Sequence, residues 1–355
     1  MTMRPGFLAS TIGLALAAAL AGGALADQIY VPLGNANRIL IVDPARDAVV
    51  GSIDGLPNVH GLAGTPDGKL LIAGSYDERP AGGPAPEKPA GVSADEHAAH
   101  HATPPAGAAK PDAMISTLSM IRTSDRRIVR RIDVPGAVHH VATSPDGRLA
   151  AVTHPDAGAV SVVDLVKFAV ISTIATGPAP NYAAFAPDGK SLYVSNTGND
   201  TVSEIDATRL YVRRNIRVGA APEHLVLSRD GRTLYVNNVQ DGTVSVLSLR
   251  SGSARTIAVG DALHGIDLSE DGRTLFVAAL GLNRIVAIDI ATGETRETPL
   301  APAPYHLAVI RGTGKIYVSS AQEPKTWVVD QKTLHVIREI AIGGKGHQMV
   351  RSPGA

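Results

Sequence analysis

The residues with the clearest potential for chemistry are histidines, of which the chain has twelve. A neutral imidazole binds zinc or copper, and it can also act as an acid or a base near neutral pH. Most of these histidines lie seven residues before the aspartate of a recurring turn, or before the residue equivalent to it. His140 and His224 lie one residue closer to that aspartate. In chain order, the residues at the seventh position are His60, His139, Asn181, Glu223, His264, His306 and His347.

The recurring turn contains an Asp-Gly pair, and four of its aspartates lie at positions 146, 188, 230 and 271, spaced 42, 42 and 41 residues apart. Asp-Gly between apolar runs predicts a hairpin turn, because glycine accepts the positive φ that tight turns need. A strand such as 192–194 follows each turn, and an alternating strand such as 202–206 comes next. Each repeat therefore predicts four short strands.

Seven such turns predict an all-β fold, a seven-bladed β-propeller with four-stranded blades. The last turn lies at the C-terminus, where only one strand, over 348–351, precedes it. Segments 29–31, 39–42 and 49–52 near the N-terminus supply three more strands. We therefore expect strands from both ends of the chain to close the last blade, which leaves no open sheet edge.

The histidine positions mark the start of the innermost strand of each blade. In a propeller these starts surround one mouth of the central channel, so the sequence predicts one such side chain per blade around that mouth. The loop after the second strand opens on the same face, and it carries His154 in one blade. A metal site at this mouth is one interpretation. In the other, the histidines hydrogen-bond the neighbouring blade and are structural.

An insertion over 77–113 makes the first complete blade about 37 residues longer than the repeat. It is rich in Pro, Ala and Gly and has no apolar period, which predicts a flexible loop. Its centre contains a short cluster of further candidate metal ligands, namely His97, His100 and His101. Alone, such a cluster is a weak metal signal.

Residues 1–26 have the features of a signal peptide: Arg4, an apolar run over 7–20, and Ala24-Leu25-Ala26 before the cleavage point. We expect residues 27–355 to form a single, monomeric propeller that is periplasmic or secreted, with no membrane insertion after cleavage. The chain has no cysteine, which excludes disulfides, thiolate metal sites and covalently attached haem. Basic and acidic residues number 33 each, so no nucleic-acid partner is expected.

Two repeats carry a resemblance to a known family. The segments LYVSNTGNDTVSEID (192–206) and LYVNNVQDGTVSVLS (234–248) resemble the YVTN-repeat propellers. The resemblance implies a propeller over nearly all of the predicted mature chain. The relatives of that family include lactonase-like propellers and the haem-binding propeller of a periplasmic nitrite reductase. The design also resembles that of some periplasmic zinc chaperones, which combine a propeller with a histidine-rich loop.

The first hypothesis is a periplasmic binding protein that holds zinc or copper at the mouth. In an extended form of this hypothesis, the protein is a metallochaperone that also delivers the metal. Its candidate ligands are His60, His139, Glu223, His264, His306, His347, His97, His100 and His101. The alternative is a metal-free scaffold that binds a periplasmic protein partner. A haem-binding protein or a lactonase-like hydrolase ranks third; a hydrolase would use histidine and Glu223 as acid or base, without a G-x-S-x-G motif.

Overall fold

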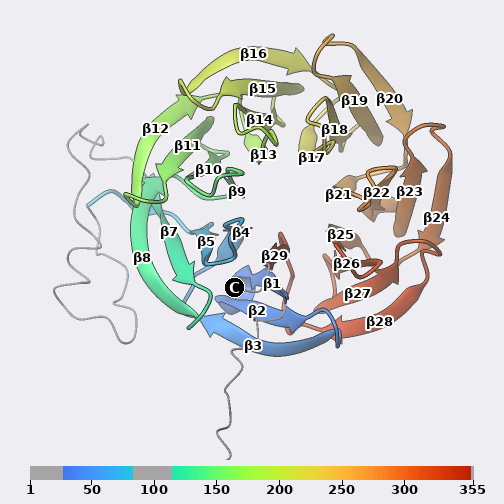
Figure 1. Ribbon diagram of the computed structural model, residues 1–355, viewed down its shortest axis with the longest axis horizontal. Coiled ribbons are helices and arrows are strands. Elements are labelled where there is room, and N and C mark those ends of the chain that lie inside the picture. The colour runs from blue at the N-terminus through green and yellow to red at the C-terminus, as the bar shows by residue number, and fades with distance from the viewer. Residues whose placement is uncertain (1–26, 83–113, 353–355) are drawn as a thin grey trace, which may run out of the picture.

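In the computed structural model, residues 27–82 and 114–352 are described and form seven antiparallel sheets arranged in a ring around a central axis (Figure 1). This confirms the seven-bladed propeller with four-stranded blades. The predicted signal peptide, the histidines at 97, 100 and 101, and most of the insertion lie outside the described residues. In the described part of the chain, no helix is long and apolar enough to cross a membrane.

The blades are numbered here along the chain from the first complete one. Blade one consists of β4 (Val59–Gly64), β5 (Leu70–Ser75), β7 (Met114–Arg122) and β8 (Arg127–Pro135), with the short β6 (Arg79–Pro80) beside β7. Blade two consists of β9 (Val141–Thr143), β10 (Leu149–His154), β11 (Ala159–Asp164) and β12 (Ala169–Ala175). Blade three consists of β13 (Pro180–Phe185), β14 (Ser191–Asn196), β15 (Thr201–Asp206) and β16 (Tyr211–Arg217).

The next three blades repeat the same order. Blade four consists of β17 (Pro222–Leu227), β18 (Thr233–Asn238), β19 (Thr243–Ser248) and β20 (Ala254–Ala258). Blade five consists of β21 (Leu263–Leu268), β22 (Thr274–Ala279), β23 (Arg284–Asp289) and β24 (Thr295–Pro299), with the 3₁₀ turn η2 (Leu280–Leu282). Blade six consists of β25 (Pro304–Ile310), β26 (Lys315–Ser320), β27 (Lys325–Asp330) and β28 (Val336–Ala341).

Blade seven joins the two ends of the chain. It consists of β29 (Val350–Ser352), β1 (Gln28–Leu33), β2 (Arg38–Asp43) and β3 (Ala48–Asp54), with η1 (Gly34–Ala36) after β1. The innermost strand β29 pairs antiparallel with β1, which aligns Val350 with Tyr30 and Ser352 with Gln28. The predicted closure, three strands from the start and one from the end, is confirmed.

The second and third strands of the blades form the core, because neighbouring blades cover both of their faces. Every residue of β14 is buried, whereas most residues of the outer strand β28 are exposed. The Asp-Gly turns lie where predicted. In four of them a serine or threonine hydroxyl donates to the turn aspartate over 2.6–2.7 Å, and the following glycine has a φ of +66° to +71°.

Arginines on four consecutive outer strands connect each blade to the next. Each side chain donates to a main-chain carbonyl oxygen of the following blade, and we call these contacts the arginine staples. They join Arg214 to Leu249, Arg255 to Ile290, Arg296 to Lys332 and Arg338 to Arg46, over 2.6–3.4 Å. The arginines are 41, 41 and 42 residues apart, so the staple recurs with the repeat from blade three to blade six.

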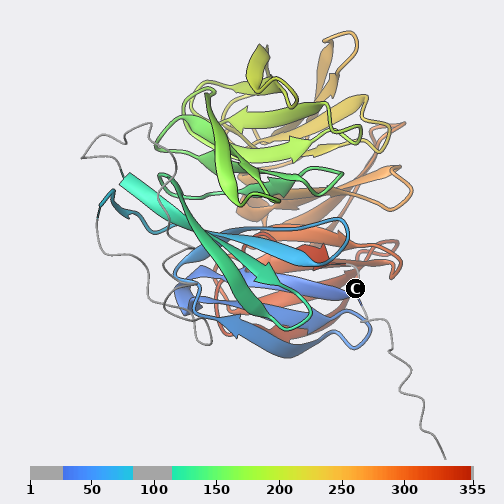
Figure 2. The same cartoon turned by 60° about the vertical axis from the view of Figure 1, so that its left-hand side comes forward.

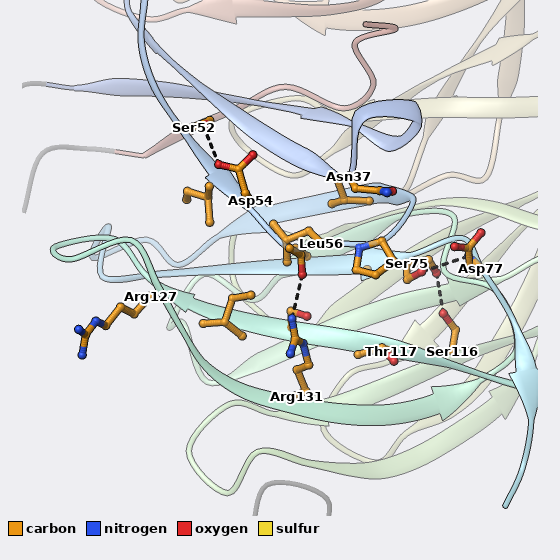
Figure 3. Close-up of a pocket in the computed structure, with 18 of the residues that line it drawn as sticks. Asn37, Ser52, Asp54, Leu56, Ser75, Asp77, Ser116, Thr117, Arg127 and Arg131 are labelled. Carbon is orange, nitrogen blue, oxygen red and sulfur yellow. Dashed lines mark hydrogen bonds between the residues drawn. The ribbon is translucent and has the colours of Figure 1, made fainter. Parts of the chain in front are cut away.

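The junction between blades seven and one lacks this staple. Gly51 of β3 stands at the equivalent position, since it pairs with Ile41 as Arg338 pairs with Val328. A groove of about 790 Å³ runs between the two blades there, lined by Ile53, Leu56 and Arg131 among others (Figure 3). Arg131 Nη2 crosses the groove and donates to the carbonyl oxygen of Gly55 over 2.8 Å. The β7–β8 hairpin of blade one projects beyond the neighbouring strands (Figure 2).

Closure of the ring should depend on the short strand β29. Deletion of residues 346–355 removes it and leaves the inner edge of β1 unpaired at the channel. We expect a loss comparable to the whole stability of a domain, about 5–15 kcal/mol, together with aggregation. Thermal unfolding measures this, and an unchanged melting temperature would show that β29 does not close the ring.

Candidate functional site

The start of each innermost strand places one residue per blade around the mouth. The pairing of β4 with β5 and of β25 with β26 shows that Tyr305, rather than His306, is the equivalent of His60. The upper ring therefore consists of His60, His139, Asn181, Glu223, His264, Tyr305 and His347. The predicted place of His306 was wrong by one residue, because the turn Gly312-Thr313-Gly314 has no aspartate and was aligned one residue too late. The strands β25 and β26 begin 11 residues apart, as β4 and β5 do, which makes Gly312 the equivalent of Asp67.

A second layer lies one residue further along each strand. This lower ring consists of Gly61, His140, Tyr182, His224, Gly265, His306 and Gln348. Three of its members, His140, Tyr182 and Gln348, also line a cavity of about 590 Å³ that continues along the inner strands. Two of the seven positions are glycine because the neighbouring main chain comes too close. A Cβ at Gly265 would lie 2.5 Å from the main-chain nitrogen of Leu307.

The aromatic side chains of the two rings contact one another almost continuously. In the upper ring the centroid of His60 lies 4.2 Å from that of His347 and 4.7 Å from that of His139. In the lower ring His140 stacks on Tyr182 with centroids 3.5 Å apart. The tyrosines Tyr182 and Tyr305 were missed in the sequence, although Tyr305 lies at the repeat position of the upper-ring histidines and Tyr182 lies one residue beyond it, like His140 and His224.

Burial keeps these imidazoles uncharged. Burial, together with the neighbouring imidazoles, lowers the pKa of His139, His224 and His347 to about 3 each. His140, His264 and His306 shift in the same direction for the same reasons. Near neutral pH the rings therefore offer nitrogen lone pairs and N–H donors rather than positive charge.

Glu223 is the carboxyl group of the upper ring. Burial raises its pKa to about 7, since removal from water disfavours the ionised form. Its Oε2 lies 3.7 Å from Nε2 of His264, and both side chains are largely buried, at 23% and 14% exposure. A carboxyl group with this pKa can take up or release a proton at neutral pH, which suits general acid–base chemistry.

Three imidazoles come close enough to hold a divalent cation. One ligand atom each of His224, His264 and His306 lies within 4.8 Å of the others. The group thus joins two of the predicted ligands, His264 and His306, to His224, which was not among them. Several buried ring nitrogens around the channel have no hydrogen-bond partner in the described structure: Nε2 of His140, His224 and His306, and Nδ1 of His264 and His347.

Two mouth histidines hydrogen-bond the neighbouring blade, as the structural interpretation proposed. Nδ1 of His60 lies 2.8 Å from the carbonyl oxygen of His139, and Nδ1 of His139 lies 3.1 Å from that of Asn181. A carbonyl oxygen only accepts, so each Nδ1 carries the hydrogen. These rings are thus held in place by the main chain, with Nε2 left for other contacts.

His154 does not face the mouth, contrary to the expectation from its loop position. It is fully buried inside blade two, with Nδ1 3.2 Å from the Ala137 carbonyl oxygen and Nε2 2.9 Å from Ser161 Oγ. Asn196 and Asn238 occupy the equivalent position in the next two blades, and each donates to a serine of the third strand over 2.9 Å. His154 is therefore a structural residue of the repeat.

A family model described as "Lactonase, 7-bladed beta-propeller" matches residues 153–339. No curated protein sequence matches the chain. Among solved structures, the periplasmic gluconolactonase PpgL of Pseudomonas aeruginosa is 17% identical with a TM-score of 0.67, over 93% of this chain and 99% of that one.

Two further structures are similar. One is a protein from Bacteroides uniformis proposed to be a 6-phosphogluconolactonase, 16% identical with a TM-score of 0.67, over 92% and 99% of the chains. The other is Kuenenia stuttgartiensis hydrazine synthase, 15% identical with a TM-score of 0.68, over 87% and 93%. At these identities the likeness shows the shared fold.

The family match overturns the expected function. A metal-carrying protein or metallochaperone ranked first from the sequence, and that hypothesis is wrong. A lactonase-like propeller, which ranked third, is what the comparisons support. The histidine pattern misled because the same side chains that bind metal also pack, hydrogen-bond the main chain and move protons.

The structural role of His154 gives a direct test. Replacement by leucine leaves Ser161 Oγ and the Ala137 carbonyl oxygen without this partner in a buried site, which should cost about 1–3 kcal/mol of unfolding free energy. Replacement by asparagine, the residue of the equivalent blades, should cost less. Denaturant unfolding of both variants measures the difference, and equal stabilities would contradict the assigned role.

Proposed function

This chain belongs to the lactonase family of seven-bladed β-propellers, and from this membership we propose that it hydrolyses a lactone at its upper ring. The observation that carries the proposal is the buried Glu223 carboxyl group beside His264, at the mouth of a channel lined by uncharged imidazoles. A hydrolase of this kind needs a group that changes protonation near neutral pH and stands where a small cyclic ester can enter.

The proposed reaction is the addition of water to the lactone carbonyl carbon. The water oxygen forms the new bond to this carbon, and Glu223, as the carboxylate, accepts a proton from the water at the same time. When the tetrahedral intermediate collapses, the bond from that carbon to the ring oxygen breaks. The protonated Glu223 then returns its proton to the departing ring oxygen. The products are a carboxylic acid and an alcohol in one open chain, with no covalent enzyme intermediate.

The neighbours of Glu223 support this role. His264 stacks against Tyr305 with ring centroids 3.8 Å apart, which fixes the imidazole next to the carboxyl group. The pKa of His264 is lowered by burial, so the imidazole is neutral and does not hold Glu223 ionised as a cation would. The pKa of the carboxyl group therefore stays near neutrality instead of falling to the usual range of glutamate.

Glu223→Gln tests the acid–base role. The amide keeps the size and most of the contacts of the side chain but cannot carry the proton, so kcat on D-glucono-1,5-lactone should fall about 10²- to 10⁴-fold. Glu294→Gln, at an exposed position in blade five, is the matched control and should retain the wild-type rate. A Glu223→Gln enzyme with unchanged kcat would remove Glu223 from the mechanism.

The pH dependence follows from the same carboxyl group. Only ionised Glu223 can accept a proton from water, so kcat/KM should rise with pH and level off above the pKa of about 7. The rate below this pKa should fall tenfold for each further pH unit. Rates corrected for spontaneous lactone hydrolysis measure the profile; a flat profile between pH 5 and 8 would contradict the role of Glu223.

The remaining expectations from the sequence stand as proposals. The proposed periplasmic or secreted location rests on the predicted signal peptide, and cell fractionation tests it. A periplasmic protein partner and a monomeric state are tested by cross-linking and by light scattering. Zinc, copper or haem as a bound cofactor stays a prediction, tested by metal analysis and visible absorbance of the purified protein.

A further inference from the structure

The two imidazoles that hydrogen-bond main-chain carbonyl groups each have a fixed tautomer. In His60 and His139 the hydrogen is on Nδ1, so the lone pair of the neutral ring is on Nε2. Burial lowers the pKa of both, that of His139 to about 3, which keeps them neutral. Both residues are only partly buried, and neither Nε2 makes a hydrogen bond to another described residue, so both lone pairs are available to a ligand.

An exposed tyrosine stands beside this pair. Tyr76 follows β5 and is 39% exposed, and its ring centroid lies 5.2 Å from that of His60 and 6.1 Å from that of His139. Its main-chain N–H donates to the Asn58 carbonyl oxygen over 2.9 Å, which fixes the start of the side chain. An aromatic face and two hydrogen-bond acceptors thus meet at one side of the mouth, on blades one and two.

We propose that Tyr76, His60 and His139 form a subsite for two neighbouring hydroxyl groups of an uncharged ligand. Two adjacent acceptors match two O–H donors, and an exposed aromatic face packs against the C–H side of a polyhydroxylated ring. A phosphate dianion has only hydrogen-bond acceptors, so it could not hydrogen-bond to the two Nε2 lone pairs. One part of this inference rests on the proposed function, namely that the ligand is a hydroxylated lactone whose carbonyl group reaches Glu223.

Asparagine is the informative replacement at both histidines. Its amide nitrogen can donate to the same main-chain carbonyl oxygen that Nδ1 reaches, while the Nε2 lone pair is absent. His60→Asn and His139→Asn therefore remove the acceptor and preserve the contact between blades. His335→Asn, at an exposed position before β28, is the matched control.

The experiment compares kcat/KM for D-glucono-1,5-lactone and for δ-valerolactone, which lacks hydroxyl groups. Each of His60→Asn and His139→Asn should lose about tenfold on the hydroxylated lactone and little on δ-valerolactone, because one ligand hydrogen bond is lost. His335→Asn should match the wild type on both. An equal loss on the two lactones, or no loss on either, would overturn the subsite.

Binding separates this inference from the proposed function. If the wild type hydrolyses neither lactone, the proposed function fails, and the subsite is then judged with D-glucitol, an unreactive polyol. Nitrogen-15 spectra of the histidines should show unprotonated Nε2 in His60 and His139, and both signals should shift when D-glucitol is added. Protonated Nε2 in the free protein, or no shift in the wild type, would overturn the subsite.

Discussion

The structure depends on the closure of the ring. Each blade buries its middle strands only because another blade lies against each of its faces, so no blade can be left out and the first must meet the last. Three residues of β29 complete this arrangement by pairing with β1 across the whole length of the chain. The channel, its two rings and the approach of His60 to His347 all exist only in the closed ring.

Closure also creates the chemistry of the channel. Seven inner strands that begin at one mouth bring side chains far apart in sequence within contact, such as His60 and His139. Packing of so many rings excludes water, which lowers the pKa of the imidazoles and raises that of Glu223. A repeat that serves the fold thereby produces a group of neutral bases and one carboxyl group that titrates near neutral pH.

The period of the turns predicted the blades, the four strands in each, and the closure of the last blade, because Asp-Gly turns and alternating strands are local features. It also predicted which residues begin each inner strand, except in blade six. There the turn at 312–314 has no aspartate to mark the repeat, and the position of Tyr305 was given to His306. The chemistry was harder to predict. Hydrogen bonds of His60 and His139 to the next blade, and the burial of His154, depend on contacts between residues distant in sequence.

The arginine staples have a consequence for how such a chain can change. Each staple connects one side chain to a carbonyl oxygen of the main chain, which every amino acid provides. A copy of any of blades three to six would therefore bring its own arginine and find an acceptor without any matching substitution in its new neighbour. Contacts of this kind permit growth by duplication, and they leave the residues at the mouth free to diverge.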